Sequence, residues 1–337
     1  MTPYIDIPVS EQTQVGEARR AATRLATDHD LDETAVGRVA LVVTELGNNL
    51  WRHAGGGRLL LGCRRDDDGC QLDVLSIDKG PGMSDVARCL RDGYSSGGSA
   101  GQGLGAVQRM STDFSIFTQP GKGCVILSRI WVPSAAPAQA PSPRARFVHA
   151  GICLAAPGEF VSGDAWDIRI ADGVASVIVA DGLGHGPVAA QAADEAIQGF
   201  AKAAAGSPSA VIERLHPMLR STRGAAVAVA TVDANAGTVT YSGAGNIAGR
   251  MISGIEDRSL MSQHGTVGVQ LRRLQDVAYS WPDHAIVVMH SDGLATRWTL
   301  KDVGGLLNCD PAVIAGWLLR EHTRGHDDVT VVVLKRD

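Results

Sequence analysis

The chain has 337 residues, of which 45% are hydrophobic and 20% charged, and its formal net charge is −5. This length predicts two domains, because one domain usually takes about 100–200 residues, and the composition is ordinary for a globular protein. The mild acidic balance argues against nucleic acid or an anionic membrane surface as a partner. The N-terminal residues contain no basic segment followed by an apolar run, and no apolar stretch could span a bilayer. Six cysteines without a C-x-x-C pair argue against a zinc site and favour a reducing compartment, so we expect a cytoplasmic protein.

The first half of the chain alternates helices and strands. Apolar residues at helical spacing predict a helix over about 10–29, and a second helix follows the capping residue Asp32 and runs to about His53. Two short strands joined by a DDDG turn come next, then a Gly-rich stretch and a helix near 104–111. Two strands around the turn PGKG close this half. The pattern predicts helices on one face of a mixed sheet.

A segment rich in Pro, Ala and Ser, residues 133–146, is typical of a solvated linker and predicts domains over 1–132 and 147–337. The second half is dominated by strand patterns such as VASVIVAD, AAVAVATVD and VTVVVLK. Helices are predicted near 187–204, 207–220 and 312–322. The predicted fold class is α/β in the α+β sense, with two sheets covered by helices in the second domain.

A first group of chemically interesting residues lies in the first half. Glu45 and Asn49 are four residues apart on the second predicted helix, so their side chains share one face. A carboxylate and an amide there can orient a nucleophile and hold a hard cation such as magnesium. Asp78 directly follows a strand, and with Gly80 and Gly82 it offers an acceptor for an exocyclic amine that approaches the backbone closely.

Three further glycines, Gly101, Gly103 and Gly105, open the helix near 104–111. Free N–H groups and the helix dipole favour phosphate at such a position. Taken singly these features are weak: a G-x-G-x-G is more often a turn, and a helical Glu–Asn pair is more often solvated surface. Their order and spacing within one compact half make a shared site the better interpretation.

The run from TELGNN through DKGPGM to GQGLG resembles the GHKL (Bergerat-fold) ATPases over about residues 10–132, closest to the RsbT and RsbW type of anti-sigma serine kinases. The resemblance implies ATP and Mg²⁺ as cofactors, and a Bergerat-fold α/β sandwich. It implies that Glu45 is the general base, Asn49 the magnesium ligand and Asp78 the acceptor for the adenine amine. It also implies that Gly80 and Gly82 line the adenine, and that the phosphates are lined by Gly101, Gly103 and Gly105.

The second half places aspartates at predicted strand ends: Asp164, Asp181, Asp292 and the pair Asp327-Asp328. Any one Asp-Gly at a strand end is ordinary turn chemistry. Several carboxylates that converge repel one another, and divalent cations relieve that repulsion. Two metals together can activate water and clamp a phosphoryl group.

In order along residues 147–336, GEFVSGDAW, VADGLGHGPVAA, YSGAGNI, HSDGLATRW and HDDVTVVV resemble PPM-type protein phosphatases of the SpoIIE/RsbX branch. The resemblance implies an α/β/β/α sandwich with two Mn²⁺ or Mg²⁺ ions. Asp181 would bridge the metals, the Gly182 carbonyl would ligate one, and Asp164 would hold a metal-bound water. Asp292 and Asp327 would ligate the other metal, with the register DDVT favouring Asp327 over Asp328.

Two positions depart from the eukaryotic members of that family. The phosphate-gripping Arg is replaced by Glu159, and the His after Asp-Gly is replaced by Leu183. The nearest histidine, His185, is the candidate leaving-group acid, although a plain loop histidine is about as good an interpretation. Asn246 is expected to stabilise a turn.

Together these features predict a bifunctional switch that phosphorylates and dephosphorylates Ser or Thr on a partner protein. The two resemblances imply that the partner is a STAS-domain protein of the anti-anti-sigma or stressosome-like kind. One alternative keeps only the phosphatase as an enzyme, with the first half as an ATP-binding regulatory or partner-binding module. A DNA- or chaperone-type GHKL machine is disfavoured, since a phosphatase rather than a transducer domain follows. The sequence leaves the oligomeric state, including a homodimer, open.

Overall fold

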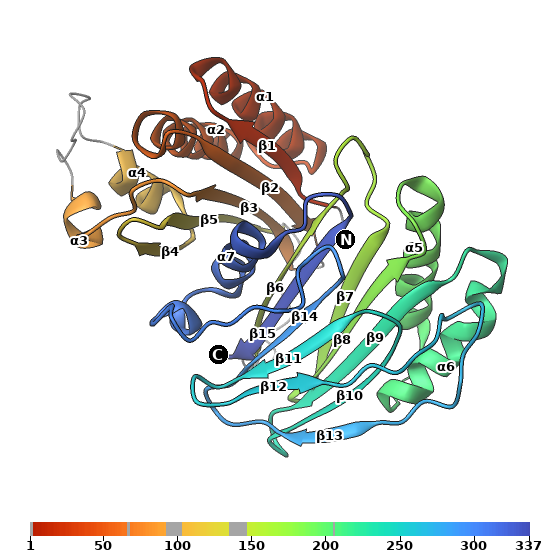
Figure 1. Ribbon diagram of the computed structural model, residues 1–337. Coiled ribbons are helices and arrows are strands. Elements are labelled where there is room, and N and C mark those ends of the chain that lie inside the picture. Colours follow the sequence, from red (N-terminus) through yellow and green to blue (C-terminus); the bar gives the residue numbers. More distant parts are fainter. Residues whose placement is uncertain (1–2, 66–67, 92–102, 135–146, 205) are drawn as a thin grey trace. The chain divides into compact units, whose positions relative to one another are not determined.

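The computed structural model describes residues 3–65, 68–91, 103–134, 147–204 and 206–337 (Figure 1). Contacts divide the chain into two units. The N-terminal unit comprises Thr2–Pro141 and Asn308–Arg320, and the C-terminal unit comprises Ser142–Leu307 and Glu321–Asp337. The predicted linker, apart from its first two residues, lies outside the described residues.

The N-terminal unit is built on a five-stranded sheet in the order β1-β2-β3-β5-β4. Its strands are β1 (Ile5–Val9), β2 (Gly57–Arg65), β3 (Gly69–Asp78), β4 (Asp113–Gln119) and β5 (Gly123–Pro133). All neighbouring pairs are antiparallel, so the prediction of a mixed sheet was wrong. The tight hairpins β2–β3 and β4–β5 make these two pairs antiparallel. After the long connection from β3, strand β4 runs parallel to β3, so β5 returns antiparallel to β3.

One face of this sheet carries helices from the first half of the chain, of which the short one at Val86–Cys89 was not predicted (Figure 1). They are α1 (Gln12–Asp28), α2 (Glu33–Asn49) with a π-helical turn at Leu50–Ala54, α3 (Val86–Cys89) and α4 (Gly103–Met110). Asp32 caps α2 as predicted, since its Oδ1 accepts from the Ala35 N–H at 2.7 Å. Alternate strand residues such as Leu59, Leu61 and Val74 face the helices in one buried core.

The opposite face of the same sheet is covered by a helix from the far end of the chain. This helix, α7 (Pro311–His322), belongs to the N-terminal unit through Arg320. Trp317 packs edge-on against Phe117 of β4, with ring centroids 4.8 Å apart. Asp310 accepts from Arg129 Nη1 at 2.9 Å, and the same guanidinium is paired with Asp73.

We therefore expect a fragment of residues 1–132 to unfold more easily than the same residues in the whole chain. An apolar sheet face becomes exposed to solvent in the fragment, and one partner of a buried ion pair is absent. A peptide of residues 308–322 added in excess should raise the fragment's melting temperature, measured by scanning fluorimetry, by binding the folded state. A scrambled peptide is the control. A fragment whose cooperative transition the peptide leaves unchanged would contradict this covering role.

The C-terminal unit is a sandwich of two antiparallel sheets, in the orders β13-β10-β9-β8-β7 and β12-β11-β14-β15-β6 (Figure 1). The strands of the first sheet are β7 (Asp164–Ala171), β8 (Val174–Gly182), β9 (Ala225–Asp233), β10 (Thr238–Ala244) and β13 (Val277–Ser280). Those of the second are β6 (Phe147–Leu154), β11 (Ala248–Ile252), β12 (Asp257–Leu260), β14 (Ile286–His290) and β15 (Val329–Arg336).

Side chains from both sheets fill the space between them, among them Trp166, Tyr241 and Val287. Gly151 is required there, because a Cβ on it would lie 2.1 Å from the Trp166 ring. Helices α5 (Pro187–Lys202) and α6 (Pro208–Met218) cover the outer face of the first sheet. The predicted α+β fold class is confirmed. Among the described residues, none of the helices combines the length and apolar character needed to cross a membrane.

Candidate functional sites

The predicted nucleotide residues of α2 lie beside the start of α4. Glu45 and Asn49 are both partly exposed near the C-terminal end of α2. A Cβ built on Gly103 would come 3.7 Å from Glu45 Oε2 and 3.9 Å from Asn49 Oδ1. The first residues of α4, where free N–H groups favour phosphate, are therefore next to the carboxylate and the amide. Gly105 is buried within α4, and Gly101 lies outside the described residues.

Asp78 ends β3 and its side chain organises the loop that follows. Asp78 Oδ1 accepts from the Gly80 N–H at 2.8 Å, and burial raises the pKa of this carboxyl. Thr118 Oγ1 accepts from the Met83 N–H at 2.9 Å and donates to the Gly123 carbonyl at 3.0 Å. Sequence reasoning missed Thr118, because its role arises only when the end of β4 is placed beside the loop after β3.

Gly82 is required by the backbone of this loop. Its φ is +67°, and a Cβ would lie 2.2 Å from the Gln119 carbonyl oxygen. Gly80 is similarly enclosed, since a Cβ there would lie 2.7 Å from Ala54 Cα. The two glycines therefore let the loop pack closely around the end of β3, where Asp78 lies.

Replacing Asp78 by alanine should weaken ATP binding by roughly 10–100-fold, the range expected for a lost hydrogen bond to a charged group. Because the pKa of Asp78 is raised, its acceptor form is lost as the pH falls, so ATP affinity should also decrease on acidification. Calorimetry on the full chain measures both effects, with the exposed Asp113→Ala as the control. Unchanged affinity in Asp78→Ala would place the adenine elsewhere.

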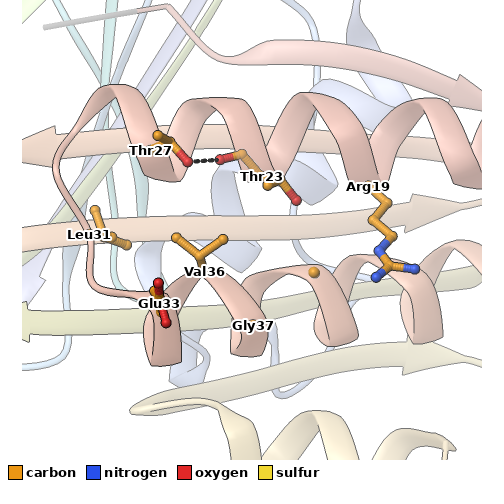
Figure 2. Close-up of a pocket in the computed structure, with 8 residues that line it drawn as sticks. Arg19, Thr23, Thr27, Leu31, Glu33, Val36 and Gly37 are labelled. Carbon is orange, nitrogen blue, oxygen red and sulfur yellow. Dashed lines mark hydrogen bonds between the residues drawn. The ribbon is translucent and has the colours of Figure 1, made fainter.

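A cavity of about 420 Å³ lies between α1 and α2 (Figure 2). It is lined by Arg19, Thr23, Thr27, Leu31, Glu33, Val36, Gly37 and Ala40. Glu33 and Val36 belong to the first turn of α2, whereas Glu45 and Asn49 are near the other end. This cavity is therefore separate from the predicted nucleotide residues.

In the C-terminal unit the predicted aspartates gather at one end of the sandwich. Asp164 and Asp181 are directly opposite each other in the β7–β8 pair. Burial, followed by the charges of Asp292 and Asp327, raises the pKa of Asp181 to about 7. Strand ends distant in sequence thus bring at least three carboxyls close enough to repel one another.

Asp164 is buried and held by a hydroxyl from the other sheet. Ser291 Oγ donates to Asp164 Oδ2 at 2.5 Å and accepts from the Thr330 N–H at 2.9 Å. Burial and the charge of Asp181 raise the pKa of Asp164 well above its usual value. Ser291 precedes Asp292 in the chain, so one turn supports two predicted site residues.

Asn246 also belongs to this site. Its Nδ2 donates to Asp292 Oδ2 at 2.7 Å, and its amide favours the ionised form of Asp181. We expected this residue to stabilise a turn, and that expectation missed its contact with a predicted ligand. The G-A-G-N sequence at the end of β10 was the available signal.

The two aspartates before β15 have different surroundings. Asp328 is buried, and its Oδ1 accepts from the Ala156 N–H at 2.8 Å. Asp327 is more exposed, and its Oδ1 accepts from the Asp328 N–H at 2.9 Å. The charges of both aspartates act on Asp181. These contacts favour Asp327 as the ligand and give Asp328 the task of holding the 156–159 turn.

The turn after Asp181 carries Gly182 and His185. The Gly182 N–H donates to the Gly163 carbonyl at 3.0 Å, and the Leu183 N–H donates to the Gly224 carbonyl at 3.0 Å. Beside this turn lies Arg223, whose Nη1 would be 3.2 Å from a Cβ on Gly184. Arg223 is exposed and brings a cation to this edge that sequence reasoning did not single out.

The donor chemistry of the acidic cluster suits divalent cations, since it supplies several oxygen ligands whose mutual repulsion a cation would offset. Within the described ranges, no three Asp, Glu, His or Cys side chains already form a closed metal cage. The carboxylates Asp181, Asp292 and Asp327 and the Gly182 carbonyl are the groups that would hold metal. In the nucleotide site the corresponding group is the Asn49 amide.

Comparison with known proteins separates the same two halves. Residues 9–129 match the family model described as histidine kinase-like ATPase domain, and residues 171–337 match that of stage II sporulation protein E (SpoIIE). The serine/threonine-protein kinase RsbT of Bacillus subtilis is 25% identical over 126 residues, which are 37% of this chain and 95% of that protein.

Two solved structures resemble the chain over more than half its length. One, described as "The bacterial stressosome: a modular system that has been adapted to control secondary messenger signaling", is 26% identical with a TM-score of 0.53 and covers 56% of this chain and 99% of its own. The other, RsbX in complex with magnesium, is 19% identical with a TM-score of 0.53 and covers 58% of this chain and 98% of its own.

The chain thus joins an ATP-binding, RsbT-like serine/threonine kinase domain to a SpoIIE-type protein phosphatase domain, a class that depends on metal ions. The resemblances on which the sequence prediction rested are confirmed. The individual site residues stay predictions, supported by the geometry given above.

Proposed function

We propose that this protein is a two-way switch that phosphorylates and dephosphorylates Ser or Thr on a STAS-domain partner protein in the cytoplasm, where ATP is available. The observation that carries the proposal is the acidic cluster, where burial, together with the charges of Asp292 and Asp327, raises the pKa of Asp181 to about 7. Such a cluster lowers the stability of the fold unless a bound cation offsets the repulsion, so it indicates a functional site that binds a cation and a phosphoryl group.

In the kinase half, the geometry supports distinct roles for three residues. Asp78 would accept a hydrogen bond from the adenine amine, which fixes the nucleotide's base. Glu45 would orient the partner's hydroxyl and take its proton, and Asn49 would hold the Mg²⁺ that offsets the charge of the triphosphate. The start of α4 would donate N–H groups to the phosphates.

In the phosphatase half, bound divalent cations would supply Lewis-acid chemistry, namely charge neutralisation on phosphate and activation of a water. Asn246 orients Asp292 for this purpose, and Ser291 orients Asp164. Arg223 is placed to attract the dianionic phosphoryl group from the side of the 182–186 turn. His185 is placed on the same turn to protonate the leaving oxygen.

A single experiment tests the switch. The full chain is incubated with ATP, Mg²⁺ or Mn²⁺, and STAS proteins from the same organism, and phosphorylation is followed by mass spectrometry. We expect one STAS protein to gain phosphate on Ser or Thr and to lose it when ATP is removed. If phosphate is removed but never added, the N-terminal unit is a nucleotide-dependent regulatory module instead.

A further inference from the structure

The two positions at which the phosphatase sequence departs from its eukaryotic relatives meet in space. Glu159 stands where an arginine was expected, and His185 stands two residues after the place where a histidine was expected. In the structure His185 Nδ1 lies 2.7 Å from Glu159 Oε1. An ionised carboxylate only accepts hydrogen bonds, so the Nδ1–H of His185 must be the donor.

The backbone around this pair is shaped to hold it. The Glu159 N–H donates to the Ala156 carbonyl at 2.9 Å, and Ala156 is itself fixed by Asp328. Gly186 has a φ of +74°, and a Cβ on it would lie 2.9 Å from Glu159 Oε2. Glycine at that position therefore leaves the space that the carboxylate occupies.

The ring nitrogen of His185 that does not contact Glu159 is the one that can reach a substrate. The His185 side chain is 63% exposed and that of Glu159 is 29% exposed. With Nδ1 engaged by Glu159, Nε2 is the ring nitrogen left to meet a substrate. The 182–186 turn that carries His185 begins at Gly182, whose carbonyl is one of the predicted metal ligands.

We propose that Glu159 is a positioning residue that fixes the His185 ring so that Nε2–H protonates the departing seryl or threonyl oxygen. The inference rests on the proposed phosphatase function and adds a carboxylate–histidine pair to it. Water forms the new P–O bond, the P–O bond to the side-chain oxygen breaks, and the proton of Nε2 passes to that oxygen. The proton released by the water returns the ring to its protonated form through solvent.

The basicity of the leaving group provides the test. An alkoxide needs a proton to leave, whereas nitrophenolate is weakly basic and leaves without one. With Mn²⁺ present, His185→Gln should lower kcat on a phosphoserine peptide by about 10²-fold or more, the usual range for a general acid. The same variant should change turnover of p-nitrophenyl phosphate far less.

Glu159 is tested through His185. Glu159→Ala should lower kcat on the phosphoserine peptide by about tenfold, the scale of a lost supporting partner, with little change in KM. Glu159→Gln keeps an acceptor oxygen and should restore most of that rate. In the His185→Gln background, Glu159→Ala should have no further effect, because the group that it positions is already absent.

Each other result overturns the inference. Equal losses on the two substrates in His185→Gln would show that the histidine supports the fold or the metal site, and an effect of Glu159→Ala that persists without His185 would give Glu159 a different role. Thermal unfolding of each variant shows whether it folds. A wild-type protein that hydrolyses neither substrate would instead refute the proposed phosphatase function itself.

Discussion

Replacing Asp181 by alanine should remove nearly all phosphatase turnover, on the order of 10³-fold or more, the scale on which a principal electrostatic group acts. Asp181 is the predicted bridging ligand, and its carboxyl lies where burial and the charges of Asp292 and Asp327 act together. Excess chelator should have a similar effect on the unaltered protein. Phosphate release from a phosphoserine peptide with added Mn²⁺ measures both.

The same substitution should not weaken the fold. In chelator, Asp181→Ala is expected to unfold at a temperature no lower than that of the unaltered protein, because it removes a buried charge among like charges. Asp194→Ala, on the exposed side of α5, is the matched control and should retain activity. Full turnover of the unaltered protein in chelator would refute the two-metal assignment.

Replacing Glu45 by glutamine should slow phosphoryl transfer to the partner by about 10²–10⁴-fold, the usual contribution of a general base. Glutamine keeps the size and hydrogen bonding of the side chain, so ATP binding should remain. Because the phosphatase would erase the product, the assay uses the Asp181→Ala background and follows label from γ-labelled ATP. This is the largest effect expected in the N-terminal unit.

A second glutamate on the same helix provides the control. Glu33, in the exposed first turn of α2, is distant in sequence from Asn49, and Glu33→Gln should transfer phosphate at the rate of the Asp181→Ala parent. If the Asp181→Ala protein binds ATP but labels none of the organism's STAS proteins, the kinase proposal is wrong. The N-terminal unit would then regulate its neighbour through nucleotide binding alone.

The sequence predicted the residues whose role follows from local pattern. Asp164 begins a strand and Asp181 comes at the end of one, Asp32 precedes an apolar helix, and Glu45 and Asn49 are one helical turn apart. Each can therefore be placed without knowing the fold. The order along the chain of the motifs that contain these residues then indicated the family resemblance.

The missed residues are those whose role depends on the register of distant strands. Ser291 supports Asp164 only because β14 ends where β7 begins. Thr118 supports the loop after β3 only because β4 and β5 pair there. No spacing rule connects such positions. A Ser, Thr or Asn near a predicted ligand is too common to single out before strands are paired.

The placement of α7 was missed for a different reason. Its residues from Pro311 to Arg320 are all buried, and their sequence PAVIAGWLLR is apolar on every side, which predicts a helix enclosed all round. That signal was present in the sequence. It does not show which part of the chain the helix packs against, however. The linker suggested that everything after residue 146 belonged to one domain.

This helix constrains how the protein can have been inherited. Among the described residues the chain enters the N-terminal unit again after Leu307 and leaves it after Arg320, so the linker does not separate the two units completely. A recombination event at the linker alone would pair the Gly316 face of α7 with a foreign sheet, in place of Leu75 and Val125. Since Gly316 leaves room for those two side chains, changes on either surface must be matched by changes on the other. We expect substitutions in α7 and in the outward face of β3 and β5 to have accumulated together, so that the two halves descend as one lineage.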